Sequence, residues 1–136
     1  MTDTVSKARR SEIMRAIKGR DTGPEMAVRR LVHGMGYRYG LHCRDLPGSP
    51  DLVFRSRGKV IFVHGCFWHA HHCDAGRRVP KTRTAFWTSK IAANRARDIR
   101  NRRDLRKREW GAMVVWECEI KALDRLARRL QRFLEA

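Results

Sequence analysis

Apolar positions recur at two spacings along the chain, and these spacings predict its elements. The helical spacing i, i+3, i+4, i+7 occurs first at Val28, Leu31, Val32 and Met35. Asp21 or Thr22 can cap this helix, Pro24 suits its first turn, and Gly34 or Gly36 can end it. The pattern therefore predicts one helix with a buried face near the N-terminus.

Strand patterns fill the middle of the chain. Residues 37–41 alternate, a turn cluster at 46–50 leads into residues 51–54, and residues 59–64 complete a hairpin. Residues 112–116 form a continuous apolar run, which is typical of a strand buried on both faces.

Three further helices are expected. Residues 6–18 predict a short basic helix, and residues 82–110 predict a long, highly charged helix with sparse apolar positions such as Trp87, Ile91, Ile99 and Leu105. The terminal helix is clearer, with one apolar face made by Leu123, Leu126, Leu130, Phe133 and Leu134. This order of elements predicts an α/β fold with a mixed central sheet flanked by helices.

The net charge of the chain indicates which class of molecule it binds. The 136 residues include 31 lysines and arginines against 14 acids, a formal net charge of +17. Such a chain repels itself unless a polyanion offsets the charge, which favours nucleic acid over a membrane surface, since no apolar run spans a bilayer. Part of the charge on the long helix is expected simply to face solvent. We expect a basic arm at residues 1–20, a single domain at 21–136, and a monomer.

Four cysteines occur, at positions 43, 66, 73 and 118. The first residues lack an apolar signal core, so we expect a cytoplasmic protein, associated with the nucleoid, whose thiols stay reduced. Cys66, His71 and Cys73 cluster, and Cys118 can complete a tetrahedral zinc site that is structural because no position stays open. Two alternatives remain: His72 could replace His71, and Cys118 could be a small buried apolar residue. Cys43 is interpreted as a spare buried thiol.

A carboxylate and a histidine lie on the two strands of the predicted hairpin. Asp51 begins the first strand and His64 ends the second, so both side chains can meet at one edge. The carboxylate is a hard ligand suited to Mg²⁺, and imidazoles transfer protons near neutral pH. A simple turn or cap aspartate is the alternative for Asp51.

From Ser6 to about Cys118 the sequence resembles the very short patch repair (Vsr) endonucleases. The matching strings are Met14-Arg-Ala-Ile17, Arg20-Asp-Thr22, Glu25, Leu46-Pro-Gly48, Pro50-Asp51, His64-Gly-Cys-Phe-Trp-His69, His71-His-Cys73, Val79-Pro80, Thr82-Arg-Thr84, Phe86-Trp87, Asn94 and Val115-Trp-Glu-Cys118. The resemblance implies a restriction-endonuclease-like core. It also implies a Mg²⁺-dependent nick 5′ to the thymine of a T:G mismatch that arises from 5-methylcytosine deamination.

The resemblance implies specific roles in the site. Asp51 binds Mg²⁺ with the backbone carbonyl of Val63, His64 and His69 are catalytic, and Glu25 supports them. Zinc is implied at Cys66, His71, Cys73 and Cys118. Restriction nucleases normally carry a second acid and a lysine where Phe62 and His64 stand here. We therefore expect imidazoles to move the protons, with His69 activating water, oriented by Glu25, and His64 stabilising charge on the phosphate.

Aromatic side chains offer a way to detect a mismatch. A wedge that unstacks a base step binds better where pairing is already defective. The residues to which the resemblance assigns DNA contact are Met14, Ile17, Phe67, Trp68, Trp87 and Asn94. Ordinary core packing is the alternative for each apolar residue.

Two other functions are compatible with these residues. One is a restriction-type, sequence-specific nuclease on the same core, and the other is a zinc-stabilised DNA-binding module without catalysis. The resemblance also implies mismatch-repair factors and a cytosine methyltransferase as partners, although no motif marks either contact. The preferred flanking bases cannot be derived from the residues.

Overall fold

A mixed sheet separates two layers of helix in the computed structural model, which describes residues 22–67, 69, 71–73, 76–77 and 82–136. The elements are α2 (Gly23–Gly34), β1 (Gly40–Leu41), β2 (Leu52–Phe54), η1 (Arg55–Arg57), β3 (Lys59–His64), α3 (Thr84–Lys107), β4 (Gly111–Trp116), η2 (Glu117–Ala122) and α4 (Leu123–Glu135). The expected helix at residues 6–18, including Met14 and Ile17, lies outside the described residues, as does Trp68.

The described strands form one sheet in the order β1-β2-β3-β4. The β1–β2 and β2–β3 pairs are antiparallel, and β3–β4 is parallel, with His64 opposite Trp116. The α/β class and the mixed sheet are thus confirmed. Since β3 runs parallel to β4, a long crossover is required, and α3 supplies it.

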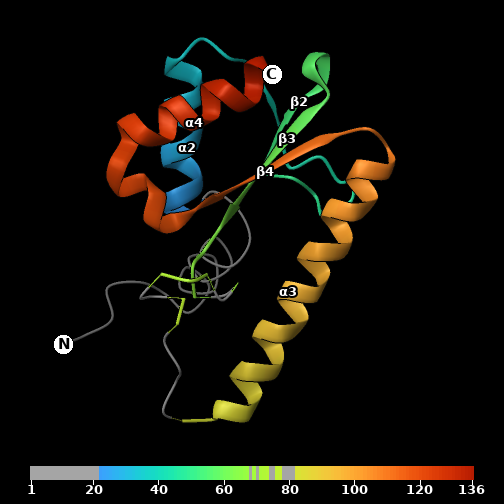
Figure 1. The fold of residues 1–136 in the computed structure, drawn as a ribbon, viewed down its shortest axis with the longest axis vertical. Helices are drawn as coiled ribbons and strands as arrows, with labels where there is room; N and C mark the ends of the chain where they lie inside the picture. The colour runs from blue at the N-terminus through green and yellow to red at the C-terminus, as the bar shows by residue number, and fades with distance from the viewer. Residues whose placement is uncertain (1–21, 68, 70, 74–75, 78–81) are drawn as a thin grey trace, which may run out of the picture.

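Each face of the sheet has its own core because side chains alternate along a strand. One face packs on α2 and α4, through Val28, Val32, Leu52, Phe54, Ile61, Met113, Val115, Leu126, Leu130 and Leu134. The other face packs Leu46, Val53, Val60, Phe62, Leu105 and Val114. Figure 1 shows α2 and α4 together on one side of the strands and α3 on the other. The prediction that β4 is buried on both faces is confirmed.

Helix α2 begins at a capping residue that the sequence predicted, Thr22. The Thr22 hydroxyl accepts a hydrogen bond from Glu25 N at 3.3 Å, and Pro24 lies in the first turn, where it costs no hydrogen bond. The helix is followed by Gly36, whose φ of +98° is a conformation that glycine adopts readily. This placement buries the carboxylate of Glu25, which is 2% exposed, beneath the sheet.

Two expectations need correction. The strand expected at residues 37–41 is only Gly40–Leu41. Tyr37 and Tyr39 pack toward the helices instead, since their hydroxyls donate hydrogen bonds to the Glu135 carboxylate and to the Arg29 carbonyl. On α4 the buried face begins at Leu126, since Leu123, its first residue, is 46% exposed.

Helix α3 buries a side chain fully only near its C-terminal end. Leu105 is its single buried residue, whereas Ile99 is 59% exposed. In Figure 1 the N-terminal half of α3 extends past the sheet. In the described part of the chain, no helix is long and apolar enough to cross a membrane.

Candidate active site and metal centre

Asp51 is held at the point where β2 begins. Its Oδ2 accepts a hydrogen bond from the backbone N–H of Val63 at 2.7 Å, so the carboxylate bridges to β3. Burial, together with the nearby Glu25, raises the pKa of Asp51 to about 6, against the lowering effect of the Val63 hydrogen bond. A bound cation would favour the ionised form, which makes Asp51 a suitable cation ligand.

Glu25 and His42 lie beside Asp51. Glu25 Oε2 is 3.0 Å from His42 Nε2 and 3.4 Å from Arg29 Nη1. Glu25, His42 and Asp51 each offer a ligand atom, and these atoms lie within 4.8 Å of one another. Glu25 was expected here, but His42 was not. A lone histidine in a loop carries no motif, and it reaches the site because its N–H pairs with the carbonyl of Asp51, continuing the β1–β2 ladder.

A second cluster joins β3, the following loop and α3. The rings of His64 and His69 stack with centroids 3.8 Å apart and an angle of 5° between their planes. His69 Nδ1 is 2.5 Å from Asp98 Oδ2, and His64 Nε2 is 3.9 Å from Asp98 Oδ1. The partner of His69 is therefore Asp98, while Glu25 lies with His42 and Asp51.

The electrostatics of this cluster follow from burial. Desolvation, helped by the neighbouring His69, lowers the pKa of His64 to about 4, so its ring is neutral at pH 7. The pKa of Asp98 is lowered, because its hydrogen bond with His69 and nearby positive charge outweigh its own desolvation. Sequence reasoning missed Asp98. Its only signal was an acid among the basic residues of α3.

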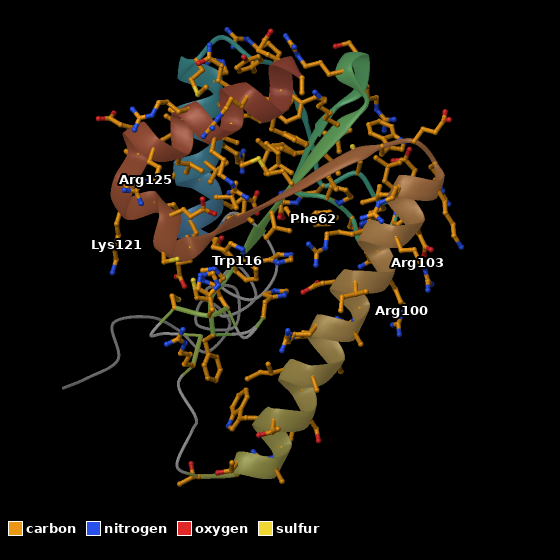
Figure 2. All side chains as sticks on the ribbon, viewed as in Figure 1. Phe62, Arg100, Arg103, Trp116, Lys121 and Arg125 are labelled. Atoms are coloured by element: carbon orange, nitrogen blue, oxygen red, sulfur yellow. The ribbon has the colours of Figure 1, made fainter. Side chains whose placement is uncertain are left out.

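Two adjoining cavities open onto these clusters. Both are lined by His64, His69, Asp98 and Arg102. One also contains Asp51, Ser49 and Asn101, and the other extends to His71 and Trp116. Asp51 and the histidine pair thus face a common space between the sheet and α3. Figure 2 shows Phe62 and Trp116 on the side of the sheet that faces α3.

A third cluster holds Cys66, His71, Cys73 and Cys118, whose ligand atoms lie within 4.8 Å of one another. His71 Nδ1 is 3.5 Å from Cys118 Sγ, and its ring stacks on Trp116 at 4.2 Å. His71 is buried and His72 exposed, so the structure brings His71 into the cluster. None of the four cysteines of the chain forms a disulfide. Cys43 lies outside the cluster, and the expectation that it is buried is wrong, because it packs only partly against the core beside Leu46.

The donor set fits zinc. Three thiolates and one imidazole in tetrahedral reach are a usual ligand set of a structural zinc ion. Burial raises the pKa of the Cys66 thiol to about 12 and that of Cys118 as well, so these thiols need a cation to ionise. The residues therefore suit a metal that deprotonates them.

Aromatic residues lie beside this cluster. The ring of Phe67 meets that of Trp87 edge-to-face at 6.1 Å, and Trp87 contacts Phe86 at 5.1 Å. Phe67 and Trp87 are partly exposed, and Phe86 is 44% exposed. Asn94 lies two turns further along α3 and is partly buried. These three aromatic residues thus gather where α3 begins, next to the Cys/His loop.

A buried-strand carboxylate facing an imidazole pair, within a basic protein, is typical of enzymes that cleave phosphodiesters in nucleic acid. Comparison with known proteins agrees. Residues 2–75 match the family described as DNA mismatch endonuclease Vsr. The chain belongs to this family and is a DNA endonuclease.

Relatives match nearly the whole chain. It is 50% identical over 135 residues to the type II nicking enzyme V.XorIIP of Xanthomonas oryzae, covering 99% of this chain and 98% of the relative. It is 44% identical over 126 residues to the DNA mismatch endonuclease Vsr of Escherichia coli, covering 93% and 80%. It is 40% identical over 134 residues to the type II nicking enzyme V.NmeAIP of Neisseria meningitidis, covering 98% and 95%.

Proposed function

We propose that this endonuclease nicks one DNA strand on the 5′ side of the thymine in a T:G mismatch, the product of 5-methylcytosine deamination, and requires Mg²⁺. The observation that carries the proposal is the common cavity of Asp51, His64, His69 and Asp98. The E. coli relative is named a DNA mismatch endonuclease, and other relatives are named nicking enzymes. The first name supports a mismatched substrate, and the second supports a cut in one strand.

Asp51 and the backbone carbonyl of Val63 would hold the magnesium ion. The N–H and C=O of one strand residue point to the same edge, and the Val63 N–H points at Asp51. When bound, magnesium supplies a positive charge that holds the phosphate oxygens and offsets their developing charge. Glu25 and His42 border Asp51 and orient its carboxylate.

His69 removes the proton from the attacking water. Its Nδ1 donates to Asp98, which leaves the lone pair on Nε2 as the base and stabilises the cation formed afterwards. Neutral His64, stacked against it, donates an N–H to a phosphate oxygen. Imidazoles thus compensate for the second acid, which restriction nucleases carry and this chain lacks.

Zinc held by Cys66, His71, Cys73 and Cys118 would have a structural role, because four protein ligands leave no site for substrate. It fixes the loop from Cys66 to Cys73, and this loop carries His69 and the wedge residues Phe67 and Trp68. Met14, Ile17, Trp87 and Asn94 complete the proposed DNA contacts. A mismatch admits these wedges at lower cost than a normal pair does.

The proposal extends to the architecture and the setting. The order of helix, three antiparallel strands, helix and parallel strand supports a restriction-endonuclease-like core at residues 21–136, preceded by a basic arm at 1–20. The enzyme acts as a monomer on chromosomal DNA in the cytoplasm, with mismatch-repair factors and a cytosine methyltransferase as partners.

A second candidate is a sequence-specific nick in fully paired DNA, since several relatives are named type II nicking enzymes. One experiment separates the two. The purified chain is incubated with end-labelled duplexes bearing T:G or T:A in varied contexts, with and without Mg²⁺, and breaks are mapped. We expect one nick beside the mismatched thymine only with Mg²⁺. Equal cutting of the T:A duplex would favour the second candidate, and no cutting of either duplex would refute both.

A further inference from the structure

Arg102 lies at the junction of the cavities around the proposed site. It is one helical turn after Asp98 on α3, so both side chains leave the same face of the helix. Arg102 lines the cavity that contains Asp51, the cavity that reaches His71, and a third beside Val114 and Phe133. Its charge also helps to lower the pKa of both His64 and Asp98, as expected for a nearby cation.

The guanidinium of Arg102 is available for a ligand. Among the described residues, no carboxylate lies within 4.0 Å of it and no hydrogen bond engages it. Arg129, which borders the third cavity, is different. It donates to both oxygens of Glu119 at 2.8 Å and to the carbonyl of Val114 at 3.0 Å. Arg129 is therefore engaged within the fold, whereas Arg102 is not.

The strand that carries His64 offers no alternative cation. Lys59, at the far end of β3, donates to backbone carbonyls at the end of α4, including that of Ala136 at 2.7 Å. The side chains of Phe62 and His64, which line the cavity, carry no charge at neutral pH. The described arginines that line the two cavities, Arg95, Arg97 and Arg102, all belong to α3, and of these Arg102 alone lines both.

We propose that Arg102 binds a non-bridging oxygen of the scissile phosphate and stabilises its charge during the nick. The inference rests on the proposed function, because it uses the same cavity. A guanidinium suits this role because it stays protonated at all working pH values and presents paired donors that match a phosphate. Arg102 and Asp51 line the same cavity, so both side chains are placed to act on one phosphate.

Arg100 provides a matched control. It is exposed on the same helix and carries the same charge, but it lines none of the three cavities. Figure 2 shows Arg100 and Arg103 on the side of α3 that faces away from Phe62 and Trp116. Any effect of lost charge alone should therefore be equal in Arg100→Gln and Arg102→Gln.

The test compares the full-length wild type, Arg102→Gln, Arg102→Lys and Arg100→Gln in single-turnover nicking of a T:G duplex at saturating enzyme. We expect Arg102→Gln to be slower by about 10²-fold, as for loss of one donor to a developing oxyanion. Arg102→Lys should recover part of the rate. Arg100→Gln should stay within about threefold of wild type, since it loses only a distant phosphate contact. Equal rates for Arg102→Gln and Arg100→Gln overturn the inference.

A binding measurement gives a second readout. Without Mg²⁺, the wild type should bind the T:G duplex about tenfold more tightly than Arg102→Gln does, the size expected for a charged hydrogen bond. A neutral methylphosphonate at the nick position should abolish this difference, and its persistence overturns the inference. If the wild type nicks no mismatch at all, the proposed function itself fails. If the wild type nicks and Arg102→Gln matches the control, only the role of Arg102 fails.

Discussion

His69 Nδ1 lies 2.5 Å from a carboxylate oxygen of Asp98, and this contact joins a loop beside the Cys/His cluster to a helix beyond it. The contact determines which ring nitrogen of His69 carries a proton. With Nδ1–H directed at Asp98, Nε2 is left as the base. The catalytic role that we propose for His69 thus depends on how α3 is placed against the sheet.

Replacement of Asp98 by Asn should therefore impair chemistry more than binding. The amide keeps the shape but can donate to Nδ1, which favours the wrong tautomer. We expect the single-turnover nicking rate to fall by about 10²- to 10⁴-fold, with T:G affinity unchanged. Asp104→Asn, on the same helix but paired with exposed Arg103, should nick normally. Equal rates for the two variants would show that Asp98 has no part in the proton transfer.

Asp51→Asn should stabilise the metal-free fold and abolish nicking. Because the pKa of Asp51 is raised to about 6, its ionised form destabilises the metal-free fold above that pH. The neutral amide removes this cost, so urea unfolding at about pH 7.5 without added Mg²⁺ should show a gain of up to about 3 kcal/mol. Nicking and Mn²⁺ binding, measured by electron paramagnetic resonance, should be lost.

The control for this prediction is Asp45→Asn, which removes an exposed carboxylate that pairs with Arg55. It should bind Mn²⁺ as the wild type does and change stability by less than about 1 kcal/mol. If Asp51→Asn still binds Mn²⁺ like the wild type, Asp51 is not the ligand.

The Cys/His cluster allows a test with two matched pairs. Cys118→Ser and His71→Ala remove members of the cluster, whereas Cys43→Ser and His72→Ala leave it intact. After reconstitution and dialysis, the first two variants should hold much less than about one zinc per chain and melt at lower temperature, because zinc binding contributes folding energy. The other two should retain the metal. Zinc lost from His72→Ala but kept by His71→Ala would reverse the assignment.

Local pattern predicts the elements that carry their own signals. The hairpin was placed by its turn residues and apolar runs, and so were Asp51 and His64 at one edge. The expected and observed bounds of β3 agree at Lys59–His64. Spacing predicted a cluster of Cys66, Cys73, Cys118 and either His71 or His72, because three members are close in the sequence and a strand end delivers Cys118. The choice between His71 and His72 needed the burial that only the fold supplies.

The residues that α3 contributes to the site could not be predicted. Its pattern is nearly featureless, with Leu105 as its one buried residue, so the sequence does not show which face meets the sheet. Asp98 and Arg102 share that face, and both were missed for this reason. His42 was missed because a backbone hydrogen bond to Asp51, and no side-chain motif, brings it to the site.

His64 should make stability depend on pH. Its pKa is about 6.5 unfolded and about 4 folded, so the unfolded chain binds the proton more tightly. The contribution of His64 is present above about pH 6.5 and is lost as the pH falls toward 4. Relative to His64→Gln, the wild type should lose about 2 to 3 kcal/mol of unfolding free energy between about pH 7.5 and 4.5. Urea titrations at both values measure this, and a constant difference would contradict the burial of a neutral ring.

Phe67 offers a test of mismatch sensing. Its ring packs against Trp87 beside the site and is partly exposed, which suits a wedge that enters the base stack. We expect Phe67→Ala to lose about five- to 100-fold in affinity for a T:G duplex, the range for one base stacked on an aromatic ring. The affinity for T:A should change less, because intact pairing resists opening. Fluorescence anisotropy on both duplexes gives the ratio.

Phe86→Ala is the matched control for Phe67→Ala. Phe86 also contacts Trp87, but its ring lies 4.4 Å from the guanidinium carbon of Arg83 and within reach of Lys90. Its loss should leave the T:G to T:A ratio near that of the wild type. If Phe67→Ala also keeps the wild-type ratio, Phe67 serves only to pack against Trp87. Mismatch discrimination would then have to come from other residues, such as Trp68 and the basic arm.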